Sequence, residues 1–132
     1  MTLTDHPGFL RAVLLIDAAS CAAMGLLMTF GATPIALMTE LPAALLTAAG
    51  ASLFPIAAFI AFVGTREPIP LGGVWLVIAG NVGWVLGSLL LAIGDLAAPN
   101  VLGVALTLGQ GAAVMLLALL EFAGLRQHAV AA

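Results

Sequence analysis

Residues 11–27 read RAVLLIDAASCAAMGLL, an almost wholly apolar stretch with a single acid, Asp17, in its middle. A helix needs ~20 mainly apolar residues to cross the hydrocarbon core of a bilayer. The whole chain shares this character, since 64% of its residues are hydrophobic and only 7% are charged. Soluble domains carry roughly 25% charged residues, and so few charges cannot cover a water-facing surface. The composition therefore predicts an integral membrane protein, with residues 1–132 forming a single domain.

The charged residues divide the chain into apolar segments. Three uncharged runs of 25, 27 and 25 residues follow one another at 41–65, 68–94 and 96–120. Each is long enough for one span, and the stretch around Asp17 supplies another. A closed β-barrel would need alternating polarity, which this sequence lacks. We therefore predict an all-α, transmembrane four-helix bundle, with helices at about 9–30, 42–64, 71–93 and 99–123.

The three arginines predict the orientation of the chain. Arg11 precedes the first span, Arg66 lies between the second and third, and Arg126 follows the fourth. All three therefore fall on one side, and because basic residues stay in the cytoplasm, we expect both termini there. In the first loop on the other side, Thr39 is expected to cap the second helix, with Pro42 in its first turn.

A short sequence repeat links the second and fourth spans. Residues 62–67 read FVGTRE and residues 122–127 read FAGLRQ, an FxGxR match at an offset of 60. The repeat favours two tandem helical hairpins, a 2+2 pseudo-repeat whose halves run in the same direction. The alternative is convergence at helix ends, where glycine and arginine are both common.

Small residues recur every fourth position on three spans, with Ala19 and Ala23 on the first. Ala79, Gly83 and Gly87 form such a series on the third span, and Gly103 and Gly111 belong to one on the fourth. Membrane helices associate through faces of this kind, because lipid tails are as apolar as leucine side chains. We predict tight packing through them, within one chain or between copies. The expected partners are the lipid bilayer and either further copies of the chain or other membrane subunits.

Asp17 is the most informative single residue. It lies six residues beyond Arg11 and therefore roughly 9 Å deeper in the membrane, on a different face of the helix. No basic residue occurs at its depth, so we expect its side chain to face the protein interior. Asn81, at a similar depth in the third span, is its expected partner, and Ser20 is a second candidate.

Two interpretations of Asp17 remain open. A carboxyl group inside a membrane is by default a proton or cation site. It could instead stabilise the bundle, as a protonated acid that is hydrogen-bonded to Asn81 or Ser20 and so joins the first and third helices. We prefer the structural interpretation slightly, because no histidine, lysine or arginine lies at that depth to relay protons to or from Asp17.

Other polar and aromatic residues within the spans are secondary candidates. Gln110 is expected to line a cavity or to bond a neighbouring helix. Trp84, Pro55 and Ser88 could border a pocket for a hydrophobic ligand, although packing is the preferred role for Trp84. Glu121 is expected to be a solvated acid at a helix end.

The sequence offers no motif of an enzyme. It has no HExxH, no glycine-rich phosphate loop and, with one cysteine, no CxxC. We therefore expect no catalytic residues, no metal site and no cofactor. Three arginines and no lysine also leave no surface suited to nucleic acid.

Three segments, LRAVLLIDAASCAAMG, NVGWVLGS and EFAGLRQ, resemble a group of small four-span bacterial inner-membrane proteins of unknown function. The resemblance covers essentially the whole chain and implies a place in the bacterial inner membrane, but no activity. Small multidrug resistance exporters share the length, the four spans and an acid in the first helix. They carry a glutamate where this chain has Asp17, and their other motifs are not found.

These observations predict a non-enzymatic structural or accessory component of a membrane assembly. The alternative is a small proton-coupled transporter of a hydrophobic or cationic solute, with Asp17 as its titrating group. A protein that binds a lipid or quinone around Trp84 and Pro55 is a third hypothesis.

Overall fold

The computed structural model describes residues 6–131, which form a bundle of helices without a strand in that range. The helices are α1 (Phe9–Phe30), α2 (Ala32–Thr39), α3 (Ala43–Thr65), α4 (Leu71–Ile93) and α5 (Val101–Ala131). The four long helices are all long and apolar enough to cross a membrane. The protein is thus an all-α, multi-pass membrane protein, as the sequence predicts.

The observed helices match three of the predicted spans to within a residue at each end, but α5 runs beyond the predicted end at residue 123. Packing against α1 explains the extension. Leu125 is 3% exposed, and the backbone at Gly124 lies against Leu10 of α1. Tertiary contacts at Gly124 and Leu125 therefore continue α5 past the predicted end.

Helix α2 was not predicted, and Thr39 does not cap α3. Thr39 is the last residue of α2, and its hydroxyl donates to the carbonyl of Ile35 at 2.7 Å. Pro34 lies in the first turn of α2, where a missing N–H costs little. Pro42 immediately precedes α3 rather than lying in its first turn. At the same end of the bundle, Asn100 caps a different helix, α5. Its side-chain oxygen accepts a hydrogen bond from Gly103 N at 2.8 Å.

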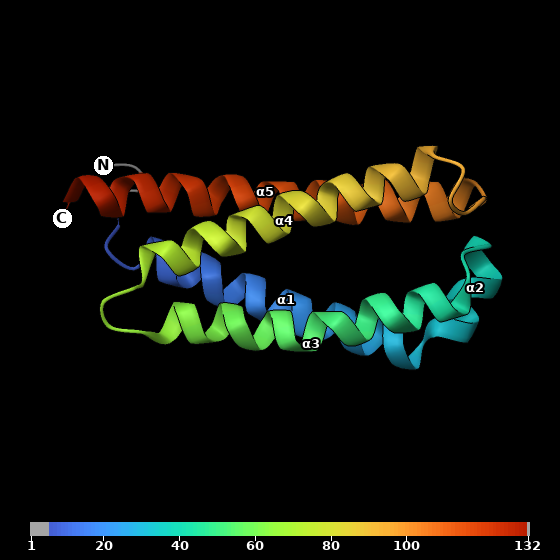
Figure 1. The fold of residues 1–132 in the computed structure, drawn as a ribbon, viewed down its shortest axis with the longest axis horizontal. Coiled ribbons are helices and arrows are strands. Elements are labelled where there is room, and N and C mark those ends of the chain that lie inside the picture. The colour runs from blue at the N-terminus through green and yellow to red at the C-terminus, as the bar shows by residue number, and fades with distance from the viewer. Residues whose placement is uncertain (1–5, 132) are drawn as a thin grey trace.

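The four long helices form two closely packed pairs, α1 with α3 and α4 with α5 (Figure 1). Helices α1 and α5 also touch, whereas α3 and α4 make few contacts although they are consecutive in the chain. Helix α1 begins and α5 ends at the same end of the bundle, next to the loop between α3 and α4 (Figure 1). This arrangement is the predicted pair of tandem hairpins.

The two copies of the FxGxR motif have matching surroundings. The Arg66 guanidinium lies over the Phe62 ring, 4.6 Å from its centroid, and Arg126 lies over Phe122 at 5.8 Å. The glycine of each copy packs against α1, where an added Cβ would stand 3.2 Å from a leucine side chain in both cases. The repeat therefore marks the two places where α3 and α5 approach the start of α1.

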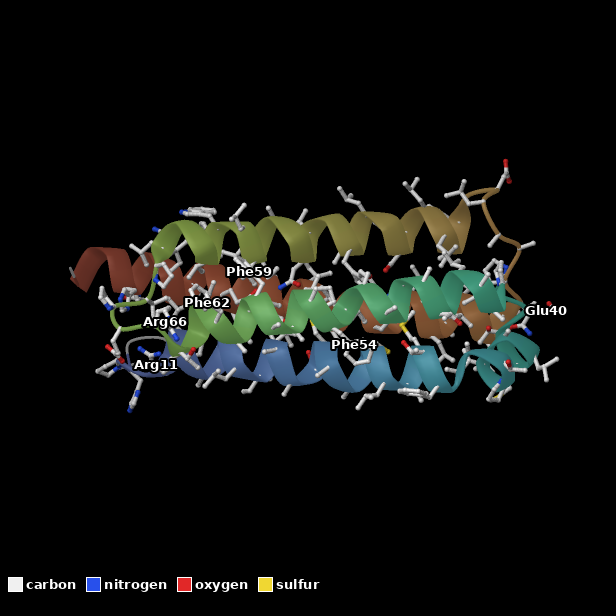
Figure 2. All side chains as sticks on the ribbon, turned by 60° about the horizontal axis from the view of Figure 1, so that its bottom comes forward. Arg11, Glu40, Phe54, Phe59, Phe62 and Arg66 are labelled. Carbon is white, nitrogen blue, oxygen red and sulfur yellow. The ribbon has the colours of Figure 1, made fainter. Side chains whose placement is uncertain are left out.

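The arginine that starts α1 has a structural role at the same end. Arg11 donates to the backbone carbonyls of Gly64 and Arg66 and forms an ion pair with Glu67. It thus satisfies carbonyl groups that the end of α3 leaves without helical partners. Figure 2 shows Arg11 and Arg66 at one end of the bundle and Glu40 at the other.

Glycines differ sharply in how close they bring the helices. At Gly50 of α3 an added Cβ would stand 2.8 Å from the Met28 side chain and 2.9 Å from the Thr29 backbone nitrogen of α1. At Gly83 and Gly87 of α4 no described atom lies within 4 Å of that position, and Ala79 is also exposed. The small residues Ala79, Gly83 and Gly87 of α4 therefore contact no other helix within the described chain. Packing through these residues between copies of the chain stays a prediction.

On α5, both predicted packing glycines lie against neighbouring elements. An added Cβ at Gly103 would meet the Thr39 backbone, and one at Gly111 would stand 3.4 Å from Ser88 of α4. Gly111 thus lies between α4 and α5, whereas Gly103 lies where α5 meets the end of α2.

We predict that Gly50→Ala lowers the free energy of unfolding by about 1–3 kcal/mol, because the added methyl group forces α1 and α3 apart. The matched variant Gly83→Ala adds the same group to open space and should leave stability unchanged or raise it slightly. Denaturant titration of both variants in mixed micelles measures the difference. Equal stabilities would contradict the close approach of α1 and α3.

Candidate functional site

Asp17 is buried in the middle of the bundle, with only 1% of its surface exposed. Its Oδ2 accepts a hydrogen bond from the Asn81 side-chain nitrogen at 2.8 Å, and its Oδ1 accepts one from the Cys21 thiol at 3.6 Å. The structure thus brings Asp17 and Asn81 together, and the bond joins α1 to α4. These two helices belong to different pairs, so the contact spans the gap between the pairs.

A second acid completes the group. The same nitrogen of Asn81 donates to Glu121 Oε1 at 2.7 Å, and Glu121 has no exposed surface. Glu121 Oε2 is buried and has no hydrogen-bond partner among the described residues. We call these three residues the Asp17–Asn81–Glu121 cluster.

The prediction that Glu121 is a solvated acid at a helix end was wrong. Helix α5 continues for ten residues beyond it, to Ala131, and Glu121 faces α1 and α4. One signal in the sequence could have found it. Glu121 precedes Arg126 by five residues, whereas Asp17 follows Arg11 by six. Because both arginines mark the same end of the bundle, the two acids lie at nearly the same depth.

The cluster contains two carboxyl groups, and no basic side chain among the described residues pairs with either of them. The two carboxyl groups lie side by side, because both accept from the same side-chain nitrogen of Asn81. Neither forms a salt bridge within the described part of the chain, and the Arg11 side chain is bound to Glu67. Two buried carboxylates side by side repel each other strongly. A proton on Glu121 would remove this repulsion and would let its carboxyl group donate a hydrogen bond.

Ser20 does not belong to the cluster. Its hydroxyl donates to the backbone carbonyl of Asp17 at 2.8 Å, within the same helix. Serine commonly satisfies itself in this way in a helix. The predicted alternative of a bond between Ser20 and the Asp17 carboxyl group is therefore not formed.

Gln110 links α4 and α5 in a second polar group. Trp84 Nε1 donates to Gln110 Oε1 at 2.8 Å, and Gln110 Nε2 donates to Ser88 Oγ at 2.7 Å. Ser88 in turn donates to the backbone carbonyl of Trp84 at 2.8 Å. The polar atoms of this group satisfy one another, so it holds the pair together and fixes the orientation of the Trp84 ring.

A cavity of 410 Å³ lies between the two helix pairs and is lined by all four long helices. Asp17, Asn81 and Gln110 form part of its wall, together with Trp84 and Pro55. Most other lining residues are apolar. Both polar groups therefore border one space, although Ser88 and Glu121 lie behind its wall.

The cavity is open towards lipid between α3 and α4. Its lining there includes the exposed side chains of Ile56 and Phe59 on α3, each 40% exposed, and Leu76 on α4, 64% exposed. Phe59 projects from α3 towards α4 (Figure 2). Gly80 enlarges the space on the α4 side, since no described atom lies within 4 Å of its Cβ position.

Comparisons of the chain with protein-family models, with curated proteins and with solved structures give no match. What the site can do is therefore inferred from its own geometry.

We predict that Asn81→Ala lowers the free energy of unfolding by about 1–3 kcal/mol, because two buried acids lose their shared donor. Ser20→Ala removes a hydroxyl that bonds only its own helix, and it should change stability by no more than about 0.5 kcal/mol. Unfolding in mixed micelles compares the two variants. A loss at Ser20 as large as that at Asn81 would show that the amide does not join the helices.

Proposed function

We propose that this protein binds a small, mainly apolar molecule inside the membrane, in the cavity between its two helix pairs. The cavity itself carries this proposal. Its 410 Å³ falls within the range of about 300–1,000 Å³ typical of small-molecule sites. Its walls are mostly apolar and include a few polar groups in fixed positions, which is the usual make-up of such a site.

The wall suggests how the ligand lies. Its polar end is placed at Asp17 and Asn81, whose carboxyl and amide oxygens can accept hydrogen bonds. Its apolar part contacts Trp84 and Phe59, and it reaches the cavity from the bilayer between α3 and α4. The ligand is bound and not transformed. Supporting this, the polar side chains at the cavity are already bonded to other groups, as Trp84 is to Gln110 and Cys21 to Asp17.

A structural role in a membrane assembly is the second candidate. The Asp17–Asn81–Glu121 cluster joins three helices, which supports a purely stabilising function for these residues. The small series Ala79, Gly83 and Gly87 faces outward and would suit contact with a second copy or another subunit. The binding proposal is preferred because a purely stabilising cluster needs no cavity beside it.

Trp84 provides a direct measurement of binding. The chain has two tryptophans, so Trp75→Phe leaves Trp84 as the single fluorophore. We expect para-bromobenzyl alcohol to quench it at saturable concentrations, since bromine quenches indole on contact. Gly80→Leu fills the cavity and should weaken binding at least about tenfold, as small changes of pocket volume do.

Gly83→Leu is the matched control for Gly80→Leu. It adds the same side chain to the same helix but outside the cavity lining, so affinity should stay that of the parent. Quenching that is unsaturable, or equally weakened by both variants, would reflect partition into the micelle and contradict the binding proposal.

We also propose that the protein lies in a bacterial inner membrane with both termini in the cytoplasm. The three arginines support this orientation through the cytoplasmic preference of basic residues. In a Cys21→Ser background, Asp95→Cys should react with an impermeant maleimide on intact cells. Glu67→Cys should react only after the membrane is opened, and the reverse pattern would invert the orientation.

A further inference from the structure

The acids of the cluster face few groups that could balance a charge. From α1 the neighbouring titratable group is Cys21, and from α4 the only polar partner is Asn81. Helix α3 contributes apolar side chains to this region, among them Ile56 and Ile60. The chain has no lysine, and no arginine among the described residues pairs with Asp17 or Glu121.

The two acids have unequal access to the cavity. Asp17 forms part of the cavity wall, whereas Glu121 lies behind it with one oxygen lacking a described partner. Asp17 accepts bonds from Asn81 and Cys21, and these two bonds stabilise its carboxylate once a cation lies beside it in the cavity. With the cavity empty, a net charge in this apolar setting is costly, and a proton on each acid removes it.

We propose that the cavity takes up a lipophilic monovalent cation in exchange for one proton of the cluster. Asp17 loses its proton to water and its carboxylate faces the cation, while Glu121 keeps its own proton and donates it to Asp17. One positive charge enters and one leaves, so the buried site stays neutral. This inference rests on the proposed binding function and names its ligand class.

The remaining wall suits such a cation. The Trp84 ring is held in place by Gln110, and Phe59 lies at the opening towards lipid. Aromatic faces attract cations most strongly where water is excluded. The opening between α3 and α4 lets the apolar part of the ligand arrive from the bilayer, as a molecule that partitions into membranes requires.

A matched pair of probes separates charge from shape. Para-bromobenzyl-trimethylammonium is a cation, and para-bromo-neopentylbenzene is its uncharged carbon analogue of nearly the same size. Trp84 quenching in the Trp75→Phe protein reports binding of each, and an indicator dye in weakly buffered micelles reports protons. We expect both probes to bind, and only the cation to release one proton for each molecule bound.

Asp17→Asn should weaken binding of the cation at least about tenfold, because the buried charge pair is lost. It should abolish proton release and leave the affinity for the neutral probe within about twofold of the parent, as removal of a charge alone implies. Retained neutral binding also shows that the variant is folded. Asp95→Asn makes the same chemical change at an exposed loop residue and should alter neither measurement.

The exchange also fixes the direction of a pH effect. Where both acids are protonated before binding, the affinity for the cation should rise about tenfold per pH unit, because one proton leaves for each cation bound. The affinity for the neutral probe should not change with pH. A cation affinity that is independent of pH would overturn the exchange.

Different outcomes test the proton exchange and the proposed binding function separately. Binding of the neutral probe without the cation, or cation binding that survives Asp17→Asn or releases no proton, would overturn the exchange and leave the cavity as a binding site. If neither probe quenches Trp84 saturably, the proposed function fails and the inference fails with it.

Discussion

A single amide nitrogen links the two helix pairs through hydrogen bonds in the interior of the bundle. Asn81 of α4 donates to Asp17 of α1 and to Glu121 of α5, so one residue connects three helices and both pairs. In lipid no water competes for these bonds, and unsatisfied polar groups are expensive. The position of the cluster therefore fixes how α4 is rotated and how far the pairs stand apart at this depth.

The cavity follows from that arrangement. Helices α1 and α3 pack tightly because Gly50 lets their backbones approach, while α3 and α4 scarcely touch. Between the pairs, the space beside the cluster is filled only in part, since Gly80 contributes no side chain. The same acids that join the helices thus border the space a ligand would occupy. A stabilising role and a binding role share these residues and do not exclude each other.

The charges at the bundle end explain why the acids remain uncompensated. Arg11, the cation nearest to Asp17 along α1, turns away to bond the end of α3 and Glu67. Arg66 and Arg126 lie over aromatic rings of their own helices. The three arginines therefore interact with helix ends and with aromatic rings at one end of the bundle. The acids in the interior have no arginine beside them, so only a proton or a bound cation can neutralise them.

The sequence by itself determined the spans, because lipid forces each apolar run of sufficient length into a helix. It also predicted the shared end of the arginines and the pairing of Asp17 with Asn81, since depth follows from counting residues along a helix. It offered Gln110, Trp84 and Pro55 as candidates beside a cavity, but it could not show that Glu121 faces inward or that Gly83 faces outward. Side chains that face lipid are as apolar as those that face the core, so the pattern of hydrophobicity does not show how each helix is rotated. Only the packing of all four long helices decided which residues meet inside the bundle.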